Sequence, residues 1–243
     1  MIIQKFGGVA MKNEAMRMIC INHIKEGIHE FDKVVVVVSA IGRYGDPYST
    51  DSLLQLTDAF SSSTAASDLV ASCGELIAAA VLSAELAREG VSNTILHGVK
   101  AGIWTTGDFG DGSISHIDTT SIIESLKLTH CVIIPGFQGI DKDGHVMTLG
   151  RGGSDLTAIA LAGALQASHV EFFKDVPGVM THDPHEAENY SKLDVLKLDE
   201  FLVLLDCDRP IIQKRAALHA IKTATPLYIR GIASSESGTW ILP

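Results

Sequence analysis

Residues 33–38 read KVVVVV, a continuous run of β-branched side chains behind one lysine. Such a run predicts a strand that is buried on both faces, as strands inside parallel sheets are. The segments 2–6 (IIQKF), 131–135 (CVIIP) and 170–174 (VEFFK) predict further strands. Together these segments point to a fold built around a buried sheet.

Helical segments separate these strands. Apolar residues recur with helical spacing from Asn13 to Ile28, and Asn13 is a suitable N-cap. A long helix rich in Ala and Leu is predicted from Leu69 to Glu89, where Gly90 ends it. Further helices are predicted over 156–165, 199–205 and 211–223, further strands at 93–96 and 226–229, loops at 42–51, 105–115 and 176–188, and a hairpin turn at 142–144.

This alternation along the whole chain predicts an α/β fold, a three-layer α/β/α sandwich with a mostly parallel central sheet. Ligands of such sheets bind at the carboxyl ends of the strands. A length of 243 residues suits one large domain or two modest ones. Because no repeat or clear linker interrupts the sequence, we predict a single domain over residues 1–243.

Composition limits the possible partners. The net charge of −10 argues against binding to nucleic acid or to an anionic membrane surface. The four cysteines are scattered without metal-ligand spacing, which predicts reduced and largely buried thiols. No signal peptide is visible, and the longest apolar stretches look too short to span a bilayer. We therefore expect a cytoplasmic protein.

The first segment with a chemical signature is KFGG, residues 5–8. Lys5 lies at the end of the first predicted strand and is followed by Gly7 and Gly8. Glycines at this place let backbone N–H groups approach phosphate oxygens, and a lysine would neutralise developing negative charge. Taken alone, the segment is also compatible with an ordinary turn from strand to helix. Neither the Walker A pattern nor the Rossmann glycine pattern is present.

The second segment is GRGGSD, residues 150–155, which precedes a predicted helix. The amino end of a helix attracts anions, and Arg151 could hold a carboxylate through two hydrogen bonds. The alternative is a surface turn in which Ser154 or Asp155 caps the helix. Three glycines around one arginine are unusual for a plain cap and favour the anion site.

The third segment is KDVPGV, residues 174–179, which leaves a buried strand at the ligand end of the sheet. Asp175 could orient a lysine or a magnesium ion beside phosphates, or it could be a turn residue. His182 and His185 flank the Asp183-Pro184 pair in the loop that follows. A proline-constrained loop of this kind is more often a solvent-exposed turn than a metal site, so we predict no metal site built from protein ligands alone.

The segments KFGGVA, VVVVSAIGRYGDPYSTD, SCGE, PGFQG, GRGGSD and DVPGVMTHDP resemble, in order, segments of the catalytic domain of aspartokinases, which belong to the amino-acid kinase family. The resemblance covers almost the whole chain and implies the amino-acid kinase fold, which is carbamate-kinase-like. It also implies ATP-dependent phosphorylation of the side-chain carboxylate of L-aspartate to 4-phospho-L-aspartate. ATP and Mg²⁺ would then be the cofactors, and a homodimer would be the assembly. Such chemistry depends on positioning, positive charge and magnesium.

The resemblance also implies roles for the residues at matching positions. Lys5 and Asp175 would be catalytic: Lys5 would stabilise the transferring phosphoryl group, and Asp175 would organise that lysine and the phosphates. Arg151 would face a substrate carboxylate, and Glu75 would face the substrate ammonium group. The residues that would hold the amino acid are Ser39, Thr50, Glu75, Arg151, Gly152, Gly153 and Ser154. Those that would contact the nucleotide are Gly7, Gly8, Lys174, Asp175, Val179, Met180, Asp183 and Pro184.

The sequence departs from the family pattern mainly on the nucleotide side. Val9 and Ala10 stand where the family has threonine and serine, and Lys174 stands where it has threonine. His185 replaces an arginine, and Pro210 falls on the position of a lysine that contacts nucleotide phosphates. Lys174 could compensate for these losses with its own charge.

These departures leave alternatives to an active aspartokinase. One is a catalytically impaired kinase-fold protein that binds an amino acid or acts as a regulatory subunit. Another is a kinase for a related acid, against which the retained amino-acid-binding residues count. Aspartokinases usually continue into small regulatory domains that the 243 residues do not contain, so the resemblance carries no feedback inhibition with it.

Overall fold

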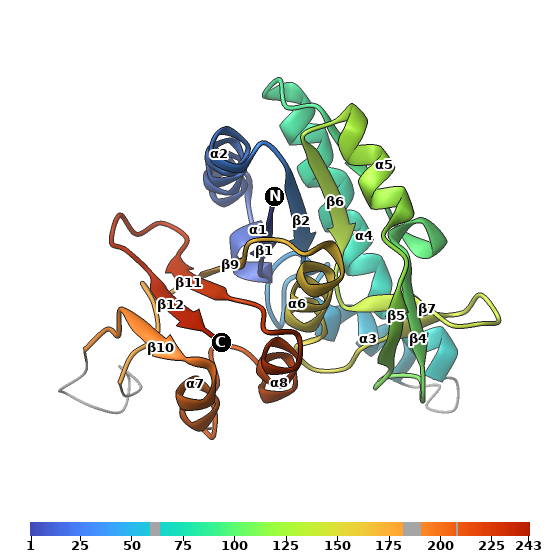
Figure 1. The fold of residues 1–243 in the computed structure, drawn as a ribbon. Coiled ribbons are helices and arrows are strands. Elements are labelled where there is room, and N and C mark those ends of the chain that lie inside the picture. Colours follow the sequence, from blue (N-terminus) through green and yellow to red (C-terminus); the bar gives the residue numbers. More distant parts are fainter. Residues whose placement is uncertain (59–63, 182–190, 208) are drawn as a thin grey trace.

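The structure is a computed structural model that describes residues 1–58, 64–181, 191–207 and 209–243. Its centre is an eight-stranded sheet in the order β10-β12-β11-β9-β1-β2-β6-β3 (Figure 1). These strands are β1 (Ile2–Phe6), β2 (Val34–Val38), β3 (Asn93–Ile95), β6 (Cys131–Pro135), β9 (Val170–Lys174), β10 (Val195–Lys197), β11 (Leu227–Gly231) and β12 (Thr239–Leu242). Every neighbouring pair is parallel except β11 with β12. The prediction of a mostly parallel sheet is therefore confirmed.

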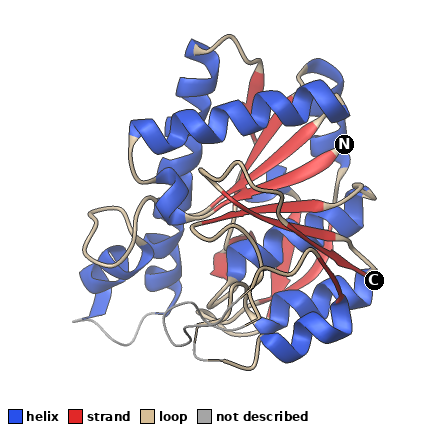
Figure 2. Ribbon diagram, turned by 90° about the vertical axis from the view of Figure 1, so that its left-hand side faces the viewer, coloured by secondary structure: helices blue, strands red, loops and turns tan. Residues whose placement is uncertain are grey.

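Helices cover both faces of this sheet, which confirms the three-layer architecture. Helices α2 (Glu14–Phe31) and α4 (Thr64–Arg88) pack on one face. The other face is covered by α5 (Thr120–Leu128), α6 (Gly153–Leu165), α7 (Leu198–Leu204) and α8 (Lys214–Thr223). Figure 2 shows the two helical layers above and below the fan of strands. Three short helices, α1 (Gly8–Met11), α3 (Thr50–Asp58) and the 3₁₀ helix η1 (Gly98–Ala101), lie in connections.

The valine run forms β2 and divides its side chains between the two helical layers. All five valines are fully buried. Val34, Val36 and Val38 belong to the apolar cluster under α2 and α4, whereas Val35 and Val37 belong to the cluster under the opposite helices. This alternation follows from the two-residue period of a strand and explains why no polar residue interrupts the run.

A smaller four-stranded sheet, in the order β5-β4-β7-β8, lies beside the main one. Its strands are β4 (Ile103–Thr106), β5 (Ser113–Ile117), β7 (Gln138–Ile140) and β8 (Val146–Thr148). The hairpin predicted around 142–144 is confirmed as the β7–β8 connection. The prediction of a loop over 105–115 was wrong at both ends, because only 107–112 connect β4 to β5. Pairing with β7 supplies backbone bonds that local composition does not reveal.

Helix α4 corrects the expectation that the apolar stretches of the chain are too short to span a bilayer. Within residues 65–88 a stretch of 18 residues has a mean hydropathy of 1.7, so by length and composition alone this helix would pass for a membrane span. In the structure Ala78, Leu82 and Leu86 are fully buried against the sheet. On another side of the helix, Glu85 pairs with Arg17 of α2 at 2.7 Å. These contacts are those of a core helix.

The cysteines are free, but they are less buried than the sequence suggested. Cys20 and Cys131 are buried, and burial raises the pKa of each thiol to about 12. Cys73 is half-buried and Cys207 is exposed. Only the first two therefore behave as the inert core thiols that we predicted.

Candidate active site

The centre of the site is a buried carboxylate between two lysines. Asp155 lies in the first turn of α6, Lys5 near the end of β1, and Lys174 is the last residue of β9. The Nζ atom of Lys5 lies 2.6 Å from Oδ1 of Asp155, and that of Lys174 lies 3.4 Å from Oδ2. Because β1 and β9 are adjacent and parallel, the two lysines reach the same carboxylate from neighbouring strands.

Burial and charge act in opposite directions on this group. Burial would raise the pKa of Asp155, but the charges of Lys174 and Lys5 outweigh it and hold that pKa below its ordinary value. Burial lowers the pKa of Lys174, and the attraction of Asp155 opposes that shift only in part. With both lysines charged, two cations share one anion away from bulk water. This excess of positive charge suits a site where negative charge develops.

Asp175 does not make the contact that we predicted for it. Its half-exposed carboxylate lies 2.7 Å from Nη2 of Arg43, a residue of the loop after β2. Asp155 instead is the carboxylate that holds Lys5. From the sequence, Asp155 was considered only as a helix cap, because a carboxylate in the first turn of a helix gives no sign of a distant partner.

Gly7 and Gly8 form the turn from β1 to α1, and the loop after β2 lies directly on them. A Cβ atom on Gly8 would overlap the carbonyl oxygen of Gly42 and crowd that of Ala40, so a side chain has no room there. The N–H of Gly42 donates to the carbonyl of Gly8 at 2.9 Å. The glycine turn and the loop over 39–49 therefore form one unit at the carboxyl end of β1.

A cavity of about 150 Å³ opens beside this unit. Its lining consists of Gly7, Gly8, Val9, Ala10, Arg43, Phe173, Lys174, Asp175 and Ile232. The glycine backbone and two cationic side chains can face an anion there. Val9 and Ala10 contribute only apolar side chains, as the sequence implied. Gly7, Gly8, Lys174 and Asp175, which were predicted to contact the nucleotide, thus line one hollow, whereas Lys5 is not among its lining residues.

Glu75 of α4 has a buried carboxyl group, and only one of its two oxygens has a hydrogen-bond partner among the described residues. Its Oε1 accepts from the N–H of Ala40 at 3.0 Å, and its Oε2 has no hydrogen-bond partner among the described residues. Burial raises the pKa of Glu75 to about 8, against the opposing effects of the Ala40 N–H and the charge of Lys5. A buried acceptor of this kind is available to a donor on a ligand.

The strand ends place two more predicted residues on this side of the sheet. Ser39 directly follows β2, and its N–H donates to the carbonyl of Phe6 at 3.0 Å. Thr50 begins α3, at the far end of the same loop. The loop therefore runs from one predicted amino-acid contact to the other, and Ala40 between them binds Glu75.

The segment from Arg151 to Ser154 forms the entry to α6. Gly152 has a φ of 74°, which is the left-handed conformation that glycine tolerates best. Gly153 begins the helix, and a Cβ there would press on Phe137 and Leu149. Arg151 is exposed, whereas Ser154 is buried. The glycines thus allow a tight turn that presents one arginine beside the amino end of α6.

Arg215 of α8 holds the segment that leads to Arg151, and it was not predicted from the sequence. Its guanidinium donates to the carbonyl of Leu149 at 2.6 Å and to that of Gly112 at 3.1 Å. It also pairs with the carboxylate of Asp111 at 2.7 Å. One side chain therefore holds two loops together just before the GRGGSD segment.

Asp68 of α4 anchors the same region from the other side. This buried carboxylate accepts from the N–H of Thr148 at 2.6 Å and from the N–H of Gly110 at 3.0 Å. Oγ1 of Thr148 also donates to Oδ1 of Asp68, at 3.0 Å. Since Glu75 is also a residue of α4, these hydrogen bonds fix the end of β8 to the helix that carries Glu75. Asp68 was not predicted either, because its partners lie 42 and 80 residues away in the sequence.

Some residues predicted to contact the nucleotide lie elsewhere. Val179 is buried in the core; its N–H donates to Oγ1 of Thr239, and its carbonyl accepts from the N–H of Leu193, both at 2.9 Å. Neither Val179 nor Met180 lines the cavity beside Lys174. The predictions for His182, Asp183, Pro184 and His185 lie outside the described residues.

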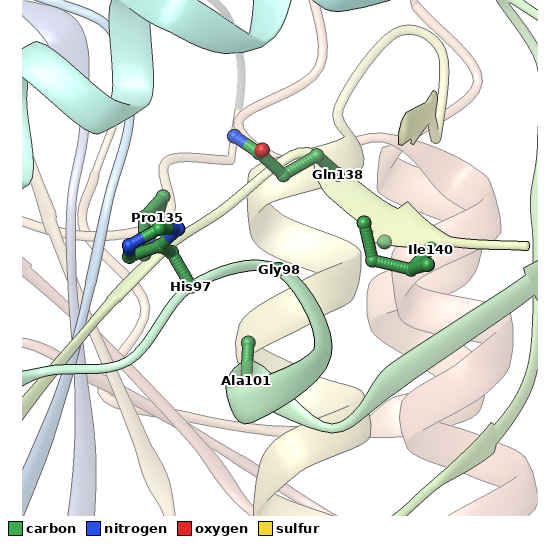
Figure 3. A pocket seen from close by; sticks show the side chains of 7 residues that line it. His97, Gly98, Ala101, Pro135, Gln138 and Ile140 are labelled. Atoms are coloured by element: carbon green, nitrogen blue, oxygen red, sulfur yellow. The ribbon is translucent and has the colours of Figure 1, made fainter. Parts of the chain in front are cut away.

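A second, smaller cavity of about 10 Å³ shares no lining residue with the first. Its lining, of which Figure 3 labels all but one residue, consists of His97, Gly98, Ala101, Pro135, Gln138, Gly139 and Ile140. This volume holds about one water molecule. The cavity is therefore too small for a nucleotide or an amino acid.

Comparisons with known proteins agree with this geometry. The amino acid kinase family matches residues 1–230. Aspartokinase 1 of Bacillus subtilis (strain 168) is 40% identical over 242 residues, which are 99% of this chain and 60% of that protein. The crystal structure of aspartate kinase from Synechocystis has a TM-score of 0.83 and 31% identity, and the match covers 99% of this chain and 40% of that one.

The fold is also that of E. coli aspartokinase III, whose structure in complex with aspartate and ADP has a TM-score of 0.81 at 22% identity, over 100% of this chain and 64% of that one. The chain spans about 60% of the length of the B. subtilis relative. The predicted resemblance and the predicted fold are both confirmed by these matches. The chain belongs to the amino acid kinase family.

Proposed function

We propose that this protein transfers the γ-phosphoryl group of magnesium-ATP to the side-chain carboxylate of L-aspartate. The observation that carries the proposal is the Lys5–Asp155–Lys174 group at the carboxyl ends of β1 and β9. The similarity to aspartokinases over 99% of the chain supports the choice of substrate.

In the proposed reaction, a carboxylate oxygen of the substrate attacks the γ-phosphorus in line with the bridging oxygen of the β-phosphate. The new O–P bond forms as the bridging O–P bond breaks, and ADP leaves with the electron pair. The attacking carboxylate is already ionised at neutral pH, so no general base is needed. Lys5 and Lys174 would stabilise the negative charge of the transferring group, and Asp155 would fix their positions.

The amino-acid end of the substrate would lie between Glu75 and Arg151. The unpaired oxygen of Glu75 would accept a hydrogen bond from the substrate ammonium group. The positive charge of this group would lower the raised pKa of Glu75, so that the carboxyl group loses its proton when the substrate binds. Arg151 would bind the α-carboxylate, aided by the amino end of α6. We also propose that Ser39, Thr50 and Ser154 complete this pocket with hydroxyl groups.

Magnesium fits the residues on the nucleotide side. Asp175 gives the cavity a half-exposed carboxylate, and Mg²⁺ binds oxygen ligands, often one or two carboxylates with substrate phosphates. Asp175 would hold the ion, which would neutralise phosphate charge when bound. Lys174, Gly7 and Gly8 would contact the phosphates directly.

The test is formation of an acyl phosphate from L-aspartate and magnesium-ATP, trapped as the hydroxamate with hydroxylamine. Wild-type protein should give product, Lys5→Ala should give at least about a hundredfold less, and Lys127→Ala, which alters an exposed lysine of α5, should match wild type. No product from correctly folded wild-type protein would contradict the proposal.

We further propose a cytoplasmic homodimer in which residues 1–243 act as one domain, with L-aspartate as its small-molecule ligand and without nucleic-acid or membrane partners. The net charge of −10 argues against nucleic-acid and membrane partners. The family resemblance supports the homodimer. Light scattering of the purified chain, at several concentrations, should give twice the monomer mass of 25.9 kDa. A mass that stays at the monomer value would contradict it.

A further inference from the structure

We infer that Arg43 is a phosphate-binding residue of the nucleotide cavity, and that it exchanges Asp175 for a nucleotide phosphate when nucleotide binds. This inference rests on the proposed function, because it takes the ligand of the cavity to be a nucleotide. It assigns a second cationic contact, beside that of Lys174, to a residue that was not predicted from the sequence.

The position of Arg43 follows from the order of the strands. Arg43 belongs to the loop after β2 and Asp175 follows β9, and these two strands lie on either side of β1. The ion pair of 2.7 Å therefore passes over the carboxyl end of β1, where Gly7 and Gly8 turn into α1. Arg43, Asp175 and both glycines line the same cavity.

The backbone of Arg43 is held in place, whereas its side chain is free to change partner. The N–H of Arg43 donates to Oδ2 of Asp46 at 2.8 Å, and the neighbouring Gly42 is fixed against Gly8. The side chains of Arg43 and Asp175 are 68% and 56% exposed. An ion pair this exposed contributes little stability, so a stronger partner can replace Asp175.

A phosphate group is such a partner. It carries more negative charge than a carboxylate, and its oxygens match the two-pronged geometry of a guanidinium. Lys174, the other cationic side chain in the cavity lining, is already directed at the buried Asp155. Since Val9 and Ala10 offer no hydroxyl groups, Arg43 is the exposed cation of this lining that can move to a phosphate.

The test is calorimetric titration with ADP in the presence of EDTA, so that binding is measured without magnesium and without turnover. Arg43→Ala should weaken ADP binding about ten- to a hundredfold, the range for loss of a hydrogen bond to a charged group. The ADP affinity of Arg43→Lys should fall between those of Arg43→Ala and wild type, because lysine keeps the positive charge but lacks the two-pronged hydrogen-bonding geometry of a guanidinium group.

Arg88→Ala is the matched control. Arg88 also pairs with a carboxylate at 2.7 Å, that of Glu14, and the two side chains are 55% and 65% exposed. The variant removes the same charge from a similar ion pair that does not line the cavity. Its ADP affinity should stay within twofold of wild type, and thermal unfolding should show all variants folded.

Asp175→Asn provides a second, independent readout. In EDTA it should tighten ADP binding several-fold, because Arg43 loses its competing partner and one negative charge leaves the cavity. If Asp175→Asn instead weakens ADP binding as much as Arg43→Ala does, the pair acts as a structural unit and the inference is overturned.

The inference and the proposed function can fail separately. Unchanged ADP affinity in Arg43→Ala, with acyl phosphate still formed by wild type, overturns the inference alone. ADP binding that depends on Arg43, without any acyl phosphate from L-aspartate, supports the inference and contradicts the proposed acceptor. Absence of ADP binding by folded wild-type protein overturns the inference as well.

Discussion

The ammonium group of Lys5 lies 2.6 Å from the carboxylate of Asp155, and both side chains are buried. The partners come from β1 and α6, and Lys174 joins them from β9. The ion pair therefore connects three elements at the point where the proposed phosphoryl transfer takes place. Its loss should affect both stability and catalysis.

Asp155→Asn should reduce turnover at least about a hundredfold, because Lys5 and Lys174 would repel each other and lose their positions. It should also destabilise the protein by about 3–5 kcal/mol, the usual result of removing one partner from a buried pair. Hydroxamate formation and urea unfolding measure the two effects. Asp206→Asn, which removes an exposed partner of Lys214, is the control and should leave both unchanged. A fully active Asp155→Asn would contradict the proposed role.

Lys174 should carry the function that the family pattern gives to a lysine at the position of Pro210. If so, Lys174→Ala abolishes turnover, because one of the two cations at Asp155 is lost. Adding Pro210→Lys to that variant should restore part of the rate. Rates of hydroxamate formation at saturating ATP compare the single and double variants. If the double variant is folded but its rate of hydroxamate formation is not restored at all, Lys174 has not taken over this function.

L-Aspartate binding should release about one proton per site at pH 7. A carboxyl with a pKa of about 8 is mostly protonated at that pH, and a bound ammonium group would favour its charged form. Calorimetry in two buffers of different ionisation enthalpy detects the released proton as a difference in apparent binding enthalpy. Glu75→Gln should show no such difference and should bind aspartate more weakly. Equal apparent enthalpies for wild type would argue against this role of Glu75.

Glu75→Gln should also change how stability depends on pH. The pKa of Glu75 is raised in the folded protein to about 8 from an ordinary value of 4.5, so the folded state binds more protons than the unfolded state between these values. Wild-type stability should therefore fall, relative to Glu75→Gln, as pH rises from 4.5 to 8, by at most about 1.4 kcal/mol per pH unit. Urea unfolding of both proteins at pH 5, 6.5 and 8 measures this. A constant difference across the range would contradict the burial effect.

Arg215→Ala should raise the KM for L-aspartate more than it changes kcat or the affinity for ADP. Its hydrogen bonds to Leu149 and Gly112 hold the loop before Arg151, which faces the amino acid in the proposed complex. Initial rates at varied aspartate, together with ADP titration, separate the two sides of the site. Lys214→Ala, at the neighbouring position, serves as the control. An equal loss of both affinities would indicate a general structural effect instead.

The main sheet was predictable because its strands have a strong local signal. The valine run at 34–38 can be accommodated only where both faces are apolar, and the observed strand, Val34–Val38, begins one residue after the start of the predicted 33–38. Strands β4, β5, β10 and β12 were missed or misread as loops. Each is short, and its stability comes from pairing with a neighbour that local composition does not identify.

The site was predictable where glycines and motif order mark it, and unpredictable where it depends on long-range contacts. Gly7, Gly8 and Lys174 do line one cavity, as expected. From the sequence, Asp155 was considered only as a possible helix cap, and the contact with Lys5 that Asp155 makes was predicted for Asp175 instead. The choice between these two carboxylates depends on how α6 packs over β1, which the chain settles only when it folds.

The position of β1 between β2 and β9 has a consequence for biosynthesis. Parallel pairing leaves one edge of β1 without its partner until residues 170–174 have left the ribosome. At about 5–20 residues per second, that interval lasts on the order of ten to thirty seconds. Throughout it, the nascent chain carries Lys5 without the strand that brings Lys174 beside it. The site is thus completed only after β9 has been synthesised, and a ribosome that stops before β9 would leave an apolar strand edge open to chaperones or to aggregation.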